Sequence, residues 1–273
     1  YNSSINGDYK LMIASDIISQ LDAKDKKVEA LKVASEAKAK YPKSQFIGNI
    51  TNLENNIINP NLNISYDVQT QANKPIHVSV NAKNVNNLWI EIYEVADVSQ
   101  FLKFVNDQYN NPFSKIKKKF VRKEQYQLIN PKDYENHITS VEMKPVPAGL
   151  YVAKFFIDGK ESEDFHFIAS DIRAVYQSKK TDTPQIKIVS SDNGKPYPNA
   201  EIKLFQFNRQ TTINPNNVTA DKDGMFVLPT VTDRNYNSYL VQLDGGNNYT
   251  FLASERGGNY RTTSRDTESF SQI

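Results

Sequence analysis

The chain has 273 residues, which suggests about two domains at roughly 150 residues each. Its 33 basic and 31 acidic side chains give a formal net charge of +2, too even a balance to predict nucleic acid or an acidic membrane surface as the main partner. It has no cysteine and only 3 histidines, which excludes disulfides, cysteine nucleophiles and thiolate metal sites and disfavours a histidine-rich metal site. Composition therefore predicts a multi-domain, non-enzymatic protein that needs no cofactor.

Within these 273 residues the sequence predicts neither a membrane helix nor a signal segment. No apolar run reaches the roughly 20 residues that a membrane helix needs. The residues after Tyr1 lack the pattern of a signal segment, in which a basic stretch is followed by an apolar one. We therefore expect no membrane insertion by this chain, and either a mature chain or a segment of a longer protein.

The first 59 residues have the three- and four-residue period of amphipathic helices. The first apolar face is predicted to consist of Tyr9, Met12, Ile13, Ile17 and Leu21. A second, Ala-rich run ends at Tyr41, because the residue before a proline avoids the helical region. Ser44 is predicted to cap a third helix, which ends before Pro60. Residues 1–59 are thus predicted to form three antiparallel helices, and the second resembles the second helix of a tetratricopeptide unit.

After the helices the apolar period changes to two, as in strands that are buried on one face. The alternating residues are Ile64, Tyr66, Val68, Ile76, Val78, Val80, Leu88, Ile90 and Ile92. A further strand is predicted over 151–157, and Asp158 and Gly159 predict a two-residue hairpin to the strand that returns. We predict one β-sandwich over residues 60–170.

This sandwich is predicted to contain an insertion over residues 96–147, with a short helix near 98–105 and further strands. The insertion contains a basic run made of Lys115, Lys117, Lys118, Lys119, Arg122 and Lys123. The run is either a site for an anionic partner or a solvated face beneath which Ile116, Phe120 and Val121 pack inward. The solvated face is favoured because the chain as a whole is nearly neutral.

Residues 171–255 are predicted to form a second β-sandwich. Short apolar stretches recur there at the roughly 8–12-residue spacing of an immunoglobulin-like sandwich. The turn signals between them are Asp192-Asn193-Gly194, Asp221-Lys222-Asp223-Gly224 and Gly245-Gly246. The tail 256–273 is polar and has no period, and we expect it to be loose.

Asp221, Asp223 and Gly224 superficially match a calcium-binding loop. An EF-hand needs a third oxygen ligand before the glycine and a glutamate six residues after it, and the sequence supplies neither. Aspartate and glycine are also the residues that a tight turn between strands requires. We therefore predict a turn at this position.

The histidines and aromatic residues give no catalytic arrangement. None of His77, His137 and His166 is placed beside a nucleophile and an orienting carboxylate, so we expect exposed or hydrogen-bonded histidines. Aromatic side chains that could stack on sugar or protein are Trp89, Tyr236 and Tyr239. A lone tryptophan on a strand belongs more often to a core than to a site. We predict no catalytic, cofactor-binding or metal-binding residue.

Two stretches resemble a known family. The motif Gly-Lys-Pro-Tyr-Pro-Asn-Ala (194–200), then a strand, then Thr-Ala-Asp-Lys-Asp-Gly (219–224) resembles the macroglobulin-like domains of bacterial alpha-2-macroglobulins. The stretch Val-Pro-Ala-Gly-Leu-Tyr-Val (146–152) resembles a strand entry in the same proteins. Helices followed by β domains resemble the N-terminal part of the long forms found in Bacteroidetes.

The resemblance implies a large envelope protein that entraps proteinases. In that family, cleavage of a bait segment triggers collapse, and many members carry a Cys-x-Glu-Gln thioester that this cysteine-free chain cannot hold. We therefore predict a mainly β protein with an N-terminal α segment, acting as a monomeric, non-catalytic scaffold in the periplasm or outer-membrane-associated envelope. Its expected partners are proteinases, through the full-length protein, or other envelope proteins. The alternative is an envelope or extracellular module of β-sandwiches that binds protein or glycan.

Overall fold

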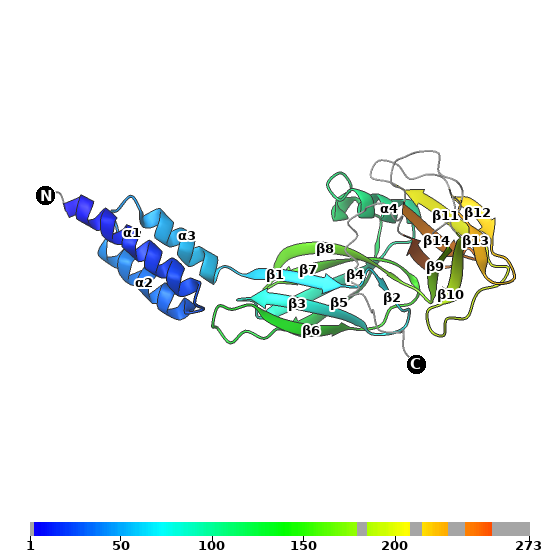
Figure 1. Ribbon diagram of the computed structural model, residues 1–273, viewed down its shortest axis with the longest axis horizontal. Helices are drawn as coiled ribbons and strands as arrows, with labels where there is room; N and C mark the ends of the chain where they lie inside the picture. Colours follow the sequence, from blue (N-terminus) through cyan, green and yellow to red (C-terminus); the bar gives the residue numbers. More distant parts are fainter. Residues whose placement is uncertain (1–2, 179–184, 208–214, 229–237, 253–273) are drawn as a thin grey trace. The chain divides into compact units, whose positions relative to one another are not determined.

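The structure, a computed structural model, describes residues 3–178, 185–207, 215–228 and 238–252. Three helices come first and are followed by antiparallel β-sheets with one further α-helix among the strands (Figure 1). This arrangement confirms the predicted class, a mainly β protein with an N-terminal α segment.

The chain divides into two compact units, which are described separately. The first unit consists of Tyr1–Ile64, Ser79–Leu88 and Tyr126–Ser140. The second unit consists of Ser65–Val78, Trp89–Gln125 and Val141–Ile273. The first unit therefore combines the helices with segments that come from the β part of the sequence.

The three predicted helices are present in the first unit. They are α1 (Ser3–Asp22), α2 (Lys27–Lys40) and α3 (Ile47–Ile58). Ala30 and Ala34 of α2 are fully buried, and these small side chains let the other two helices approach closely. The buried core of the helices consists of Leu11, Ala14, Ile18, Ala30, Ala34, Ile50 and Ile57.

The predicted apolar face of α1 is wrong in most of its members. Leu11, Ala14 and Ile18 point into the core. The exposed residues are Tyr9, Met12, Ile13 and Ile17, and only Leu21 of the predicted set packs against the core. The prediction failed because α1 is apolar on two faces, so its period alone does not tell which face is buried.

The predicted cap of α3 is also wrong. The residue at the N-cap is Phe46, and no side chain caps this end. Ser44 instead accepts a hydrogen bond from the backbone N–H of Phe46 at 3.2 Å and donates its own hydroxyl proton to the carboxylate of Asp8. Ser44 therefore ties the turn before α3 to the start of α1.

The strands predicted between residues 60 and 170 form two sheets. The elements are β1 (Asn61–Tyr66), β2 (Gln69–Thr70), β3 (Ile76–Lys83), β4 (Asn87–Glu94), α4 (Val98–Asn106), a 3-10 turn (Phe113–Lys115), β5 (Lys119–Gln127), β6 (His137–Met143), β7 (Gly149–Ile157) and β8 (Lys160–Ala169). One sheet has the order β2-β8-β7-β4-β5 and the other the order β1-β3-β6. The short β2 runs parallel to β8, whereas β7 and β8 are antiparallel.

The β7–β8 hairpin forms at the predicted turn. Ile157 pairs with Lys160, which leaves a two-residue loop. Both loop residues have positive φ, 44° at Asp158 and 85° at Gly159, as a type I′ turn requires. This turn matches the right-handed twist of the strands and fixes their register.

Strand β7 is buried on both faces, which explains its nearly unbroken apolar sequence. Tyr151 stacks on Phe167 of β8 with ring centroids 5.1 Å apart, and Phe155 stacks on Phe165 at 4.4 Å. The opposite side of β7 belongs to a second core, described below.

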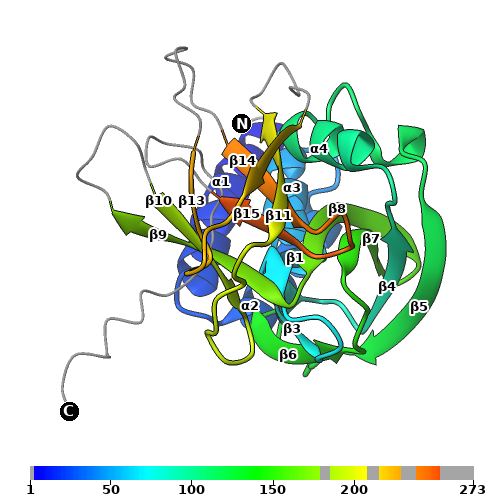
Figure 2. The same cartoon turned by 90° about the vertical axis from the view of Figure 1, so that its right-hand side faces the viewer.

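The strands of the second predicted sandwich also form two sheets (Figure 2). They are β9 (Ile172–Ser178), β10 (Gln185–Ser190), β11 (Glu201–Phe207), β12 (Asn216–Thr219), β13 (Met225–Val227), β14 (Ser238–Leu243) and β15 (Tyr249–Leu252). The sheet orders are β13-β10-β9 and β12-β11-β14-β15. Both sheets supply one core, for example Ile188 from the first and Leu204 and Val241 from the second. A sandwich is therefore present in the described part of this region.

Helix α4, the helix predicted in the insertion, packs against strands from two different sheets. Asp97 caps it by accepting hydrogen bonds from Ser99 N at 2.8 Å and Gln100 N at 3.2 Å. Three of its side chains are fully buried, namely Phe101, Leu102 and Phe104. The core around them includes Leu150, Val152 and Ile168 from β7 and β8 and Phe207, Leu240 and Tyr249 from β11, β14 and β15. Helix α4, strands β7 and β8, and strands β11, β14 and β15 thus share one apolar core inside the second unit.

Candidate functional site

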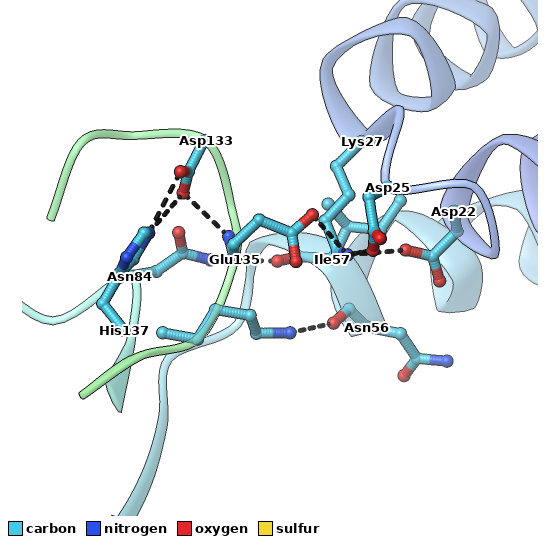
Figure 3. Close-up of polar contacts among 10 residues, drawn as sticks. Asp22, Asp25, Lys27, Asn56, Ile57, Asn84, Asp133, Glu135 and His137 are labelled. Carbon is cyan, nitrogen blue, oxygen red and sulfur yellow. Dashed lines mark hydrogen bonds and ion pairs between the residues drawn. The ribbon is translucent and has the colours of Figure 1, made fainter. Parts of the chain in front are cut away.

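Within the first compact unit, polar side chains of the helices contact two loops of the β part (Figure 3). One loop follows β3 and the other lies between β5 and β6. We call this set of contacts the helix joint. It consists of Asp22, Asp25, Lys27, Asn56, Ile57, Ile58, Lys83, Asn84, Asp133, Tyr134, Glu135 and His137.

Lys27, the first residue of α2, is the central cation of the helix joint. Its Nζ lies 2.7 Å from Oε1 of Glu135, 3.3 Å from Oδ1 of Asp25 and 3.7 Å from Oδ1 of Asp22. The Lys27 side chain is only 13% exposed. Burial alone would lower the pKa of Lys27, but the hydrogen bonds and charges of Glu135 and Asp25 outweigh it and raise the pKa. The ammonium group is therefore held in its charged form.

The loop after β3 caps the C-terminal end of α3. The Nδ2 of Asn84 donates to Ile57 O at 2.9 Å and to Ile58 O at 3.0 Å, and Lys83 Nζ donates to Asn56 O at 2.5 Å. The last carbonyls of a helix have no partner within the helix and carry partial negative charge, so an amide and an ammonium group both stabilise them.

The backbone at Asn84 suits this task. Its φ is 57°, in the left-handed region that asparagine tolerates better than most residues. The conformation turns the chain at the end of β3 while the side chain reaches the helix. The residue type therefore serves both the turn and the cap.

The loop between β5 and β6 brings an aromatic ring and an acid to the helices. Tyr134 packs against the core of the helices and has a φ of 63°. Asp133 shapes the loop, because it accepts from Glu135 N at 2.9 Å and contacts His137 Nε2 at 2.9 Å. The hydrogen bond with His137, and next that with the Glu135 backbone, lower the pKa of Asp133. A charged Asp133 thus holds the neighbouring Glu135 where Lys27 reaches it.

The helix joint has the chemistry of a structural connection. Its carboxylates contact the ammonium group of Lys27, the ring of His137 and the backbone N–H of Glu135. An ion pair, a helix cap and an apolar contact, each from a different stretch of sequence, fix the helices to the end of the sheet.

A second connection lies inside the second compact unit, at Gln69 of β2. Its Nε2 donates to Ile172 O at 3.2 Å, and its Oε1 accepts from Thr250 Oγ1 at 3.1 Å and from Phe251 N at 3.3 Å. One amide side chain thus joins β2 to β9 and β15. The sequence contains no signal for this contact, because a lone glutamine on a short strand is normally exposed.

Three cations of the basic run contact partners within the chain. Lys118 Nζ donates to Phe113 O at 2.6 Å and lies 4.0 Å from the centroid of the Phe113 ring. Burial, and next the charge of Lys154, lower the pKa of Lys118. Lys123 pairs with Glu91 at 3.1 Å, and Arg122 pairs with Glu124. These contacts account for three cations of the basic run, so none of the three needs an anionic partner from another molecule.

The expected inward packing beneath the basic run is only partly right. Ile116 is 7% exposed, but Phe120 is 54% and Val121 36% exposed. The reason is that Lys119, Phe120 and Val121 begin β5, which lies at the edge of its sheet. A strand at an edge is covered less than the central strands are.

The three histidines differ from one another. His77 lies on an exposed position of β3, between the buried Ile76 and Val78, as predicted. His137 contacts Asp133. The expectation for His166 is wrong, because both ring nitrogens are buried and have no hydrogen-bond partner among the described residues. Burial lowers the pKa of His166 to about 4.

The surroundings of His166 explain the error. The sequence pattern correctly placed it opposite Phe165 and Phe167, but that side of β8 is not solvent. The rings of Phe101 and Phe104 from α4 lie 5.9 and 6.3 Å from the imidazole, and the ring of Phe251 from β15 lies 6.4 Å away. Helix α4 and β15 therefore help to shield the ring nitrogens of this histidine from water.

The turn at Asp221 forms as predicted. Asp221 Oδ1 accepts from Asp223 N at 2.8 Å and from Met225 N at 2.9 Å, and Gly224 has a φ of 75°. The hydrogen bonds from Met225 and Asp223 lower the pKa of Asp221. The carboxylate is thus used by the turn itself.

Neither of the two candidate aromatic residues that the structure describes is fully exposed. Tyr239 cannot stack on a ligand at the surface, because it is only 4% exposed and belongs to the core shared by Ile188, Leu204 and Val241. Trp89 is half-buried rather than a core residue. Tyr236 lies outside the described residues. Among the residues that the structure describes, no group of three or more acidic or histidine side chains could hold a metal ion.

In the described stretches, no helix has both the length and the apolar character needed to cross a membrane. No protein-family model matches the sequence, and no curated protein matches it at a significant level.

The fold of this chain is similar to that of solved structures. A crystal structure of native alpha-2-macroglobulin from Escherichia coli spanning domains MG0-NIE-MG1 matches with a TM-score of 0.53 and 19% identity over 70% of this chain; the chain covers 64% of that structure, less than two thirds of it. A structure of the same protein spanning domains NIE-MG1 matches with a TM-score of 0.51 and 19% identity, over 72% of this chain and 97% of that one. At this identity the likeness concerns the fold. The fold of this chain therefore resembles that of the N-terminal domains of a bacterial alpha-2-macroglobulin.

Proposed function

We propose that this chain is a non-catalytic scaffold segment of an alpha-2-macroglobulin-like proteinase trap in a bacterial cell envelope. The observation that carries the proposal is the match to the NIE-MG1 structure, of which this chain covers 97%. The motifs at 146–152, 194–200 and 219–224 support it independently, since they point to the same family. Proteinases would be bound by the full-length protein, and this chain would hold other parts of that protein in place.

Within this proposal the segments keep their predicted extents. Residues 1–59 are a helical segment, 60–170 and 171–255 are macroglobulin-like sandwiches, and 256–273 is a tail. The periplasm or the outer-membrane-associated envelope is the proposed location, and a Bacteroidetes-type long form is the proposed kind of protein. The order of helices before β domains supports this last point.

The contacts favour a rigid part over a moving part. A trap must keep its domains in register while one segment is cleaved, and both connections described above resist displacement. The helix joint combines charge, helix capping and apolar packing. The two sandwiches share a continuous apolar core around α4 and are also bridged by Gln69.

The test uses the full-length protein and a general proteinase. Proteinase activity is measured with a large protein substrate and with a small peptide substrate, before and after incubation. A trap should slow cleavage of the large substrate and leave cleavage of the small one nearly intact, because entrapment blocks access rather than the active site. Heat-denatured full-length protein is the control. Unchanged cleavage of both substrates would refute the proposal.

A further inference from the structure

Helix α1 has two apolar faces, and the residues that the structure describes cover only one of them. The inner face carries Leu11, Ala14 and Ile18, which are at most 9% exposed. The outer face carries Tyr9, Met12, Ile13 and Ile17, which are 65%, 50%, 42% and 43% exposed. The spacing of these four residues places them on one stripe, about 12 Å long at 1.5 Å per residue. We call this stripe the outer α1 face.

The other two helices have polar outer faces. Helix α2 exposes Glu29, Lys32, Ser35, Glu36 and Lys40, and α3 exposes Asn49, Asn52 and Asn56. Val28 and Ile58 are exposed singly at helix ends, as scattered apolar residues often are. In the described part of the helical segment, four large apolar side chains are therefore exposed together on α1 alone, with the exposed Asp16 beside them.

This asymmetry is the pattern of a helical array that continues on one side. Helices in an array contact their neighbours, and the terminal helices need a polar outer face to stay soluble. Helices α2 and α3 have such a face, whereas the outer α1 face has the composition of a contact surface. The apolar spacing of three and four residues suits an amphipathic helix laid along α1.

The size of the stripe decides between possible occupants. Burying one aliphatic side chain removes roughly 60–120 Å² from water, so four partly exposed side chains offer on the order of 300 Å². A stable interface between separate proteins buries about 800 Å² on each partner. A second copy of this chain would therefore bind weakly through this face. A helix on the same polypeptide needs no such area, because covalent connection gives it a high effective concentration.

We propose that the outer α1 face is covered in the full-length protein by a further amphipathic helix of the same polypeptide that lies ahead of α1. The proposal rests on the proposed function, in which this chain is one segment of a larger protein. It extends that function by naming the surface through which the scaffold continues.

The absence of native cysteine allows a direct test by thiol labelling. Met12→Cys and, independently, Ile17→Cys place one thiol on the outer α1 face. Ser35→Cys on the exposed side of α2 is the matched control. Each variant is made in the 273-residue chain and in the complete reading frame, and the rate of labelling by a maleimide is measured at several protein concentrations.

We expect both face variants to react about tenfold or more slowly in the full-length protein than in the 273-residue chain, because a covered thiol reacts only when its surroundings open. Ser35→Cys should react equally in both. Equal rates for the face variants would overturn the proposal. Protection that appears in the 273-residue chain as its concentration rises would assign the face to a second copy and would also overturn it. Labelling does not depend on proteinase binding, so this test can fail while the trap test succeeds.

Discussion

The ammonium group of Lys27 lies 2.7 Å from the carboxylate of Glu135, 108 residues further along the chain. The pair joins the first turn of α2 to the loop between β5 and β6. The side chain of Lys27 is 13% exposed and that of Glu135 is 30% exposed, so water screens the pair less than it screens an ordinary surface pair. This contact is the clearest sign that the helices and that loop form one structural unit.

Glu135→Gln should lower the free energy of unfolding by about 1 kcal/mol, because Lys27 then keeps only Asp22 and Asp25 as charged partners. Urea denaturation at low salt measures the change. Glu36→Gln, on the exposed side of α2, is the control and should have little effect. Equal effects of the two substitutions would show that the ion pair contributes nothing to stability.

Two substitutions at Asn84 separate its cap from its backbone conformation. Asn84→Gly removes the hydrogen bonds to Ile57 O and Ile58 O, at a cost of about 1 kcal/mol, but tolerates the φ of 57°. Asn84→Ala removes the same bonds and adds left-handed strain, so it should cost about 1 kcal/mol more. Chemical denaturation of both variants measures the difference. If Asn84→Gly is as stable as the parent, the cap is not what stabilises α3.

His166 should make stability depend on pH. The folded protein holds the ring neutral with a pKa of about 4, whereas a free histidine has a pKa near 6.5. Between these values the unfolded chain binds the extra proton, so the stabilisation is complete above pH 6.5 and is lost as the pH falls towards 4. The full loss corresponds to about 3 kcal/mol at 1.36 kcal/mol for each pKa unit.

The check compares urea denaturation at pH 7 and pH 4.5 for the parent and for His166→Leu. The leucine variant should lose less stability on acidification. Carboxylates take up protons in both proteins, but only the parent also has the buried histidine that must be protonated on unfolding. His77→Leu, at an exposed position, should behave as the parent does. An unchanged pH dependence in His166→Leu would mean that the ring reaches water in the folded state.

Gly194 and Gly224 form a matched pair in the second sandwich. Both have positive φ, 70° and 75°. An added Cβ at Gly194 meets nothing within 4 Å, whereas one at Gly224 would lie 2.9 Å from Pro196 Cβ and 3.1 Å from Ile188 O. Gly194→Ala should cost about 1 kcal/mol from backbone strain alone, and Gly224→Ala about 3 kcal/mol. Equal costs in thermal denaturation would contradict the close packing at Gly224.

Much of the fold could be predicted because local pattern determines local structure. The turn at Asp158 and Gly159, the helix around Phe101 and the strand before it all follow from period and turn chemistry. The buried face of α1 could not be predicted in the same way. Both of its faces are apolar, and only the packing against α2 and α3 decides which face is inside.

The candidate site was the least predictable part. Lys27 and Glu135 are ordinary charged residues in the sequence, and nothing local shows that a loop 108 residues away reaches the helix. Gln69 and His166 were missed or misread for the same reason, because their surroundings come from distant strands and from α4. Such contacts depend on tertiary structure, which a periodic pattern does not record.

Under the proposed function, this chain is a non-catalytic scaffold and inhibition of proteinases needs the rest of the protein. The most direct measurement incubates a general proteinase with the isolated 273-residue chain and, in parallel, with the full-length protein, and follows cleavage of a large protein substrate. We predict that the full-length protein slows this cleavage and that the isolated chain neither slows it nor forms a covalent adduct. Inhibition by the isolated chain alone would contradict the account.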